Sequence, residues 1–272
     1  MSTLRRIFGV DRPLIAMCHL LGLPGRPRHD VAGGTAAIVE PLARDAEALQ
    51  AAGVDGLLFC NENDLPYQLQ VGPEVAATMA AAIARLQDMV RVPFGVDVLW
   101  DPKATLAVAR ATGAAFVREV FTGVYESDMG LMAPSFGDLA GYRHAIGADG
   151  LAVFTNITPE FSRSVSGRPV GDRARSAAYL GVDALLVSGQ MAGVSAEMDD
   201  LRAAKEAAGD LPVLANTGVN RDNVGRILEV ADGVIVGTSL KVDGWTWNAV
   251  DPGRARQVVE LVAEARQRAA VR

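Results

Sequence analysis

Two kinds of segment alternate along this chain. Short, continuous apolar runs are separated by longer Ala-rich segments whose apolar positions recur with a helical period. A continuous apolar run is typical of a strand buried on both faces, as in a parallel sheet covered by helices. The runs predict eight strands: Leu14–His19, Gly56–Asn61, Pro93–Leu99, Ala115–Phe121, Gly150–Asn156, Ala184–Ser188, Val213–Asn216 and Gly233–Gly237.

The intervening segments predict helices. They are Ala36–Ala52, Glu74–Met89, Thr105–Thr112, Phe136–Ile146, Asp172–Leu180, Glu197–Ala208, Asn220–Ala231 and Pro252–Arg268. This repeat and the length of 272 residues match an α/β fold, a single (β/α)8 TIM barrel. The runner-up, an open doubly wound sheet, needs a G-x-G-x-x-G turn after the first strand, and Leu21–Gly25 lacks that spacing. We predict one domain over residues 1–272, with an N-terminal extension to about residue 12 and an outer helix at about 252–270.

Composition and charge narrow the setting. Half of the residues are hydrophobic, yet no run approaches the roughly 18 residues of a membrane span, so we expect no transmembrane segment. The formal charge of −6 argues against nucleic acid as a partner. Cys18 and Cys60 both fall in predicted strands, which favours a reduced, cytoplasmic protein. For a barrel of this kind we also expect a homo-oligomer.

Small-residue turns follow the last two predicted strands, at 215–218 and 237–241. Glycine lets a backbone approach a ligand, and the loops after strands seven and eight of TIM barrels commonly bind phosphate. We therefore predict a site for a small phosphorylated ligand on backbone N–H groups here and at Gly189. Of the lysines Lys103, Lys205 and Lys241, only Lys241 follows a strand next to this site, where it suits charge neutralisation better than imine formation.

Polar side chains gather at the carboxyl ends of the predicted strands, where TIM barrels carry their chemistry. The candidate catalytic residues, for acid–base or metal-assisted chemistry, are His19, Glu62, Asp97 and Glu119. The candidate substrate-binding residues are Asn61, Trp100, Arg118, Asn156, Ser188, Gly189, Asn216, Thr217, Gly218, Gly237, Thr238, Ser239 and Lys241. A divalent metal ion is one option for a cofactor, although no H-x-H or H-E-x-x-H spacing is present.

Several of these residues have a structural interpretation beside the functional one. His19 is either a hydrogen-bonded strand end or a ligand contact, and Trp100 is either core or a stacking platform. Asp97, inside an apolar strand, must meet a cation, a metal or a network of donors. Neighbours along a strand face opposite ways, so only one of Arg118 and Glu119 faces the lumen, and we favour Glu119.

The chain also resembles a known family. Ala16-Met17-Cys18-His19-Leu20 followed by Leu23-Pro24-Gly25 resembles the start of BtpA-like proteins. Further matching motifs are Gly53–Gly56, Asn61-Glu62, Leu65–Tyr67, Val71–Glu74, Pro93–Val96, Phe116–Arg118, Thr122-Gly123, Ser127–Gly130, the two small-residue turns and Asp243-Gly244. The resemblance spans about residues 7–260 and implies a phosphate-binding TIM barrel. It is stronger to the branch linked to sugar-utilisation operons than to the photosynthetic branch, whose Lys-His after strand five is replaced by Asn156–Glu160.

Two hypotheses follow. The first is an isomerase, epimerase or lyase acting on a small phosphorylated sugar or nucleoside-derived ligand. The alternative, which the resemblance implies through the family's role in photosystem I biogenesis, is a non-catalytic assembly factor that uses the barrel as a ligand-binding module. We expect mobile loops at Ser127–Ser135 and Ser162–Gly171, because both are rich in small and polar residues.

Overall fold

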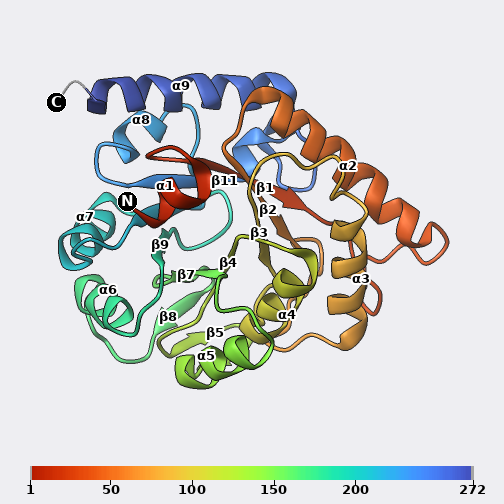
Figure 1. The fold of residues 1–272 in the computed structure, drawn as a ribbon, viewed down its shortest axis with the longest axis horizontal. Helices are drawn as coiled ribbons and strands as arrows, with labels where there is room; N and C mark the ends of the chain where they lie inside the picture. The colour runs from red at the N-terminus through yellow and green to blue at the C-terminus, as the bar shows by residue number, and fades with distance from the viewer. Residues whose placement is uncertain (1, 271–272) are drawn as a thin grey trace.

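The computed structural model describes residues 2–270 and contains a closed parallel barrel surrounded by helices (Figure 1). The strands pair in the order β1-β11-β10-β9-β7-β4-β3-β2, so the first strand closes the barrel against the last. Their bounds are β1 (Leu14–His19), β2 (Gly56–Cys60), β3 (Phe94–Asp97), β4 (Phe116–Glu119), β7 (Ala152–Asn156), β9 (Ala184–Ser188), β10 (Val213–Asn216) and β11 (Gly233–Val236). The predicted TIM barrel is confirmed.

The main helices follow the strands. They are α2 (Gly34–Ala52), α3 (Pro73–Ala84), α4 (Pro102–Thr112), α5 (Phe136–Ala145), α6 (Val170–Tyr179), α7 (Met198–Ala207), α8 (Val224–Ile227) and α9 (Pro252–Ala270). The helix predicted at Asn220–Ala231 is much shorter, because the segment before Val224 turns on side-chain bonds such as Asn220 N–H to Asn223 Oδ1, 2.8 Å. Left-handed Gly53 and Gly113 end α2 and α4, where φ of 94° and 74° suits glycine. None of the helices within residues 2–270 combines the length and apolarity needed to span a membrane.

The strands separate two apolar layers. Leu14, Ala16 and Cys18 pack outward against the helices, whereas the alternate residues Ile15 and Met17 face the lumen. This alternation places every second side chain of each strand in the lumen, and it fixes which polar residues meet at the carboxyl ends.

A short helix, α1 (Thr3–Phe8), closes the amino end of the barrel. The Ser2 side chain caps it by accepting from Arg5 N–H, and Gly9 ends it at φ 75°. Its buried Phe8 ring meets Phe116 edge to face at 5.4 Å, and Phe116 stacks on Phe154 at 4.9 Å. Aromatic side chains therefore fill the lumen at the amino end of the strands, and the cavity described next opens at the carboxyl end.

The loops after β4 and β7 form a small antiparallel sheet of their own. Its strands are β5 (Tyr125–Ser127), β6 (Gly130–Met132) and β8 (Ser162–Ser164), in the order β6-β5-β8. The two segments predicted to be mobile loops each contribute a strand to this sheet, and β5 joins them through hydrogen-bonded pairs such as Glu126 with Arg163. Two 3-10 turns, η1 (Thr238–Leu240) and η2 (Val242–Gly244), follow β11.

Candidate functional site

Most barrel strands place a polar side chain at their last inward-facing position. The alternation set by the lumen residues Ile15, Leu58 and Phe116 defines this face of three strands. Around the barrel the residues are His19 (β1), Cys60 (β2), Asp97 (β3), Arg118 (β4), Asn156 (β7), Ser188 (β9) and Asn216 (β10). The polar residues thus gather above the apolar filling, as predicted from the strand ends.

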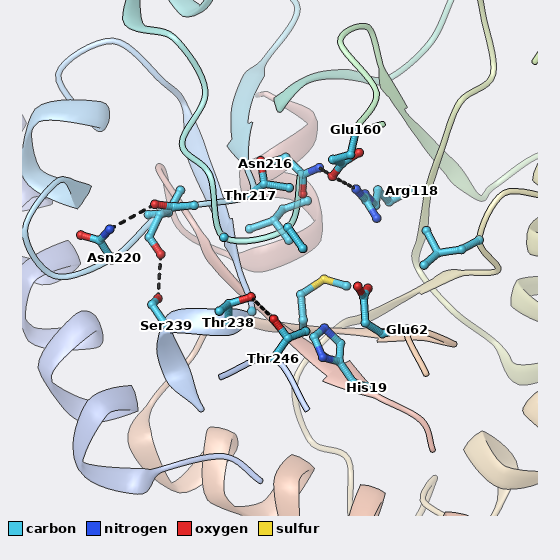
Figure 2. Close-up of a pocket in the computed structure, with 18 of the residues that line it drawn as sticks. His19, Glu62, Arg118, Glu160, Asn216, Thr217, Asn220, Thr238, Ser239 and Thr246 are labelled. Atoms are coloured by element: carbon cyan, nitrogen blue, oxygen red, sulfur yellow. Dashed lines mark hydrogen bonds and ion pairs between the residues drawn. The ribbon is translucent and has the colours of Figure 1, made fainter. Parts of the chain in front are cut away.

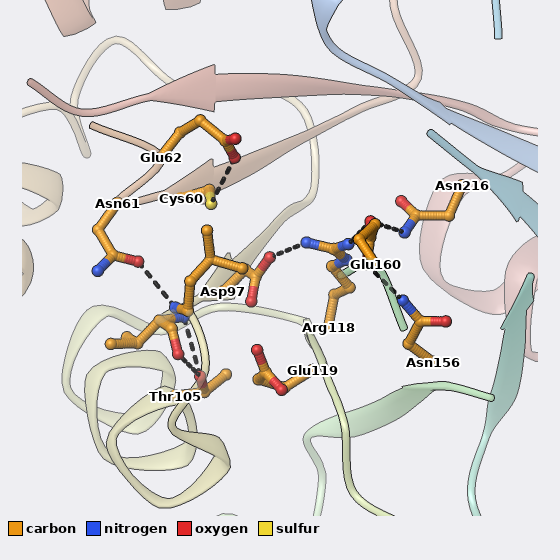
Figure 3. Close-up of polar contacts among 12 residues, drawn as sticks. Cys60, Asn61, Glu62, Asp97, Thr105, Arg118, Glu119, Asn156, Glu160 and Asn216 are labelled. Carbon is orange, nitrogen blue, oxygen red and sulfur yellow. Dashed lines mark hydrogen bonds and ion pairs between the residues drawn. The ribbon is translucent and has the colours of Figure 1, made fainter. Parts of the chain in front are cut away.

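Arg118 is the centre of a buried ionic network (Figure 3). Its guanidinium pairs with Asp97 and, through Nη2, with Glu160 Oε1 at 2.7 Å. Both carboxylates are at most 4 % exposed, so each depends on this cation. Burial nevertheless raises the pKa of Asp97 to about 6, with the attraction of Arg118 opposing the shift. The prediction that Asp97 must meet a cation or donors is confirmed, but Asp97 is fully buried against Arg118 and does not line the cavity, so the structure does not place it where it could contact a ligand directly.

Glu160 is also held by amides from neighbouring strands. Asn156 Nδ2 donates to Glu160 Oε2 at 2.9 Å, and Asn216 Nδ2 donates to Oε1 at 3.2 Å. Both amides lie within hydrogen-bonding distance of Ser188 Oγ, at 2.9 and 2.7 Å. Glu160 is not among the predicted site residues, because a position four residues after a strand end carries no sequence signal for this contact. Asn156 and Ser188, predicted to bind substrate, instead support Glu160 from outside the cavity.

A central cavity of about 240 Å³ opens above this network (Figure 2). Its floor and walls come from loops on opposite sides of the barrel. Predicted site residues that line it are His19, Glu62, Trp100, Arg118, Asn216, Thr217, Gly218, Gly237, Thr238 and Ser239. Tyr67, Glu160, Phe161, Thr246 and Arg254 also line it and were not predicted.

Glu62 supplies a cavity-facing carboxyl group. Tyr67 Oη donates to Glu62 Oε1 at 3.0 Å, and Cys60 Sγ lies 3.8 Å from Oε2. Burial raises the pKa of Glu62, while the Tyr67 hydrogen bond and the nearby charge of Arg118 oppose the rise. A carboxyl group whose pKa is raised toward neutral pH is suited to accept a proton and to return it.

His19 borders the same cavity (Figure 2). Burial, followed by the positive charge of Lys241, lowers its pKa to about 3, so the imidazole is neutral at physiological pH. Its Nδ1 is buried and has no hydrogen-bond partner among residues 2–270. A neutral imidazole can hydrogen-bond a polarised oxygen, but it does not supply a positive charge.

Trp100 belongs both to the core and to the cavity wall. It is only 5 % exposed, and its ring lies within 6.4 to 6.5 Å of the rings of Tyr67 and Phe161. All three aromatic residues line the central cavity. They form a semi-rigid apolar wall that a flat or partly apolar ligand face can contact.

The turn after β10 lines the cavity and also packs against a neighbouring loop. Thr217 and Gly218 have φ of 62° and 60°, and a Cβ on Gly218 would lie 2.1 Å from Ser195 N. Gly189 is similar, since its Cβ would lie 2.1 Å from Val194 O, and its N–H donates to Thr217 Oγ1 at 2.8 Å. These glycines let the loop 189–196 pack closely, and Gly189, whose N–H is already used, does not line the cavity. The structure therefore does not place the Gly189 N–H where it could donate to a ligand in the central cavity.

The turn after β11 retains free donors. Ser239 Oγ donates to Val219 O at 2.7 Å, and the Thr238 and Thr246 hydroxyls lie 2.8 Å apart (Figure 2). These bonds orient the side chains, but the backbone N–H groups of Thr238 and Ser239 find no acceptor within residues 2–270. The turn can therefore still bind an oxyanion through its backbone.

Lys241 is not the cation of this turn. Its Nζ lies 2.6 Å from Asp45 Oδ2 of α2, and the residue is 1 % exposed and absent from the cavity lining. The assignment of Lys241 to substrate is thus wrong: a buried ion pair fastens the turn to α2. Arg254, at the start of α9, lines the cavity and has no ion-pair partner within residues 2–270. Nothing in the sequence indicated that Arg254, two residues into a predicted helix, would line the cavity.

Two further expectations are wrong. Arg118, not Glu119, faces the lumen, because it shares the face of Phe116; the Glu119 carboxylate is 2 % exposed and accepts from Val120 N–H. Asn61 does not reach the cavity either. Its Oδ1 accepts from Leu99 N–H at 2.8 Å and its Nδ2 donates to Asp64 Oδ2 at 2.9 Å. Glu119 and Asn61 are therefore structural, and no cluster of three or more His, Cys, Asp or Glu side chains suited to a metal occurs in the described part of the chain.

The family of this chain follows from comparison with known proteins. The profile of the BtpA family matches residues 10–264. The chain belongs to the BtpA family. It is 42 % identical over 98 % of its length to the putative sgc region protein SgcQ of Escherichia coli K12, all of which is covered. It is 34 % identical over 94 % of its length to the photosystem I biogenesis protein BtpA of Synechocystis sp. PCC 6803, 90 % of which is covered.

Solved structures with the same fold are more distant in sequence. N-acetylmannosamine-6-phosphate 2-epimerase from Clostridium perfringens has a TM-score of 0.56 and 14 % identity, with 97 % of this chain and 96 % of that one covered. N-(5'-phosphoribosyl)anthranilate isomerase from Pyrococcus furiosus has a TM-score of 0.56 and 12 % identity, with 93 % and 99 % covered. At these identities the likeness shows the barrel fold alone.

Proposed function

We propose that this BtpA-family barrel is an acid–base enzyme of the isomerase, epimerase or lyase type, acting on a small phosphorylated sugar-like substrate. One observation carries the proposal: a single cavity contains a carboxyl group of raised pKa, Glu62, and an arginine without an ion-pair partner among the described residues, Arg254. The first is suited to proton transfer and the second to holding an anionic group.

The anionic end of the substrate would lie against the turn after β11. Backbone N–H groups of Thr238 and Ser239 would donate to phosphate oxygens, and Arg254 would neutralise their charge. Gly237 lines the cavity between this turn and His19, and a Cβ there would lie 3.4 Å from His19 Nε2. The anion position and the proposed reaction centre are thus close enough for one small molecule.

The reacting end would lie between Glu62 and His19. The Glu62 carboxylate would remove a proton from a carbon next to a carbonyl group, and the neutral His19 ring would hydrogen-bond the oxygen on which charge develops. Arg118, Glu160 and Asn216 are held rigidly and can receive substrate hydroxyl groups. The names of the two solved neighbours concern phosphorylated compounds, but the substrate class here rests on the cavity.

Deuterium exchange tests the proposal without knowledge of the product. The protein is incubated in D₂O with a panel of aldose and ketose phosphates, and loss of a carbon-bound proton signal is followed by NMR. We expect exchange with at least one compound, and a loss of roughly 10²–10⁴-fold in Glu62→Gln. The matched control is Glu126→Gln, because Glu126 is exposed on β5 and does not line the cavity.

Binding without any exchange or conversion would contradict the enzyme and favour a ligand-binding role in assembly, the kind of role that the name of the Synechocystis relative describes. Exchange that persists in Glu62→Gln would show that another group is the base. Absence of binding by every phosphorylated compound would contradict the phosphorylated substrate itself.

A further inference from the structure

A second cavity, of about 590 Å³, opens beside the loop 189–196. One side is formed by β8, the segment after it and the first turn of α6, and the other by the end of β9 and the start of α7. These elements lie together at one edge of the barrel in Figure 1. Ala192 and Gly193 of the loop line the central cavity, whereas Val194 and Ser195 line the second one. The two cavities therefore share a wall.

Three arginines line this second cavity, which we call the arginine cavity: Arg163, Arg168 and Arg173. Within residues 2–270, none of them has an acidic partner within 4.0 Å. The neighbouring Arg175 differs, since it pairs with Asp172 at 2.8 Å and does not line the cavity. In a chain of net charge −6, a group of arginines without ion pairs is a local attraction for anions.

Arg173 adds a buried donor that lacks an acceptor. Its Nε is inaccessible to solvent and finds no hydrogen-bond partner in the described part of the chain. Tyr125 lines the same cavity and is 1 % exposed; Arg173 partly offsets the rise that burial causes in the pKa of the Tyr125 hydroxyl group, which donates to Ile157 O at 3.2 Å. An unmet buried donor is costly, and an oxyanion in the cavity can bring the guanidinium an acceptor.

Two carboxylates add acceptors to the cavity. Glu197 and Asp200, at the start of α7, line it, and the charge of Arg173 acts on Asp200, opposing the rise in pKa that burial causes. Their carboxylates accept hydrogen bonds and repel a second anionic group. The ligand must combine one anionic end with hydrogen-bond donors at the other.

We infer that the arginine cavity is a second binding site, for a small hydroxylated anion such as a phosphorylated polyol, separate from the central cavity. The anion would lie against Arg168 and Arg173, and the hydroxyl groups would donate to Glu197 and Asp200. The loop 189–196, which packs on Gly218, lines both cavities and lies between the two sites. This inference does not depend on the proposed catalysis.

The test is a titration with glycerol 3-phosphate followed by amide NMR shifts of the full chain. We expect one group of shifts in residues 162–173 and 194–200, separable from a group at 237–239. Arg173→Gln should raise the Kd of the first group roughly tenfold or more and leave the second within about twofold. Arg254→Gln should do the reverse, so failure at one site is distinguishable from failure at the other.

Two more variants distinguish a loss of binding from a loss of the fold. Arg168→Gln changes an exposed residue of the cavity and should weaken the first group without loss of the fold, whereas Arg175→Gln, on α6 with Arg173, should leave both groups unchanged. Shifts confined to 237–239, or a first group that is unaffected by both Arg173→Gln and Arg168→Gln, would overturn the inference. Equal binding of inorganic phosphate and glycerol 3-phosphate would overturn the role assigned to Glu197 and Asp200.

Discussion

The two sides of the central cavity differ in what carries their chemistry. On the side of β1 to β4 the groups are side chains: the carboxyl of Glu62, the imidazole of His19 and the guanidinium of Arg118. On the side of β10 and β11 the backbone of the two turns lines the cavity, and side chains such as Ser239 are already bonded to neighbouring loops; Arg254, at the start of α9, is the exception. A substitution on the first side removes a functional group, whereas a substitution in the two turns mainly changes the path of the chain. Variants on each side should therefore fail in different ways.

The largest effect is expected from Arg118→Met. The change leaves Asp97 and Glu160 buried without their cation, which should lower the free energy of unfolding by about 3–5 kcal/mol. Urea unfolding measures it. The control is Arg202→Met, because Arg202 pairs with Asp199 at 2.8 Å on the surface and should cost no more than about 1 kcal/mol. Equal losses in the two variants would contradict the central place of Arg118.

The next effect separates two glycines of the backbone side. Gly218→Ala adds a Cβ that would lie 2.1 Å from Ser195 N at φ 60°, so we expect a loss of stability of about 1–3 kcal/mol or more. In Gly237→Ala the nearest atom, Met17 Cγ, is 3.2 Å away, so stability should change less. Thermal unfolding of both variants decides, and a reversed order would contradict the packing of the loop 189–196 on Gly218.

A smaller effect is expected in binding. Arg254→Gln should raise the Kd for inorganic phosphate at the central cavity roughly tenfold, because a charged hydrogen bond contributes about 1.5–3 kcal/mol. Calorimetric titration, with the unfolding midpoint as a check on the fold, measures it. Arg256→Gln is the matched control, since Arg256 lies on the same helix, is exposed and does not line the cavity. No change in Kd would remove Arg254 from the anion site.

The smallest effect is a pH dependence of stability. The pKa of His19 falls from 6.5 to about 3 on folding, so between these values the unfolded state binds more protons than the folded state. His19 should therefore contribute stability above pH 6.5 that is lost progressively as the pH falls toward 3. Chemical unfolding at several pH values should show a steeper decline for the native chain than for His19→Gln.

The comparison with His19→Gln is needed because Asp97 acts in the opposite direction. Its pKa rises from 3.8 to about 6 on folding, so its contribution is present at low pH and is lost as the pH rises through that window. The difference between the two proteins cancels this shared contribution. An identical pH dependence in both would contradict a buried, neutral His19.

The strands could be predicted from the sequence because a doubly buried strand leaves a local signal, the uninterrupted apolar run. For the same reason their inward face could not be predicted: in Ala115–Phe121 both faces are apolar, so the pattern did not separate Arg118 from Glu119. Arg118 faces the lumen because Phe116, two residues earlier on the same strand, does so, and this orientation depends on the closure of the barrel.

The partners of site residues could not be predicted either, because they lie far away in the sequence. Lys241 meets Asp45 across 196 positions, and Arg118 meets Glu160 across 42. A basic residue beside a small-residue turn looks the same in the sequence whether it binds a ligand or another part of the chain. His19 and Glu62 were placed correctly at the cavity because a strand end fixes the height of a residue in the barrel.

The closing helix α1 has a consequence for the order of events during synthesis. Phe8 leaves the ribosome before Phe116, whose ring it packs against, and Phe154, on which Phe116 stacks, have been made. Nor can β1 pair with β11 until β11 itself has emerged. The segment that contains α1 and β1 therefore reaches its final packing only after β11 has been synthesised, so its docking is a late step in the closure of the barrel.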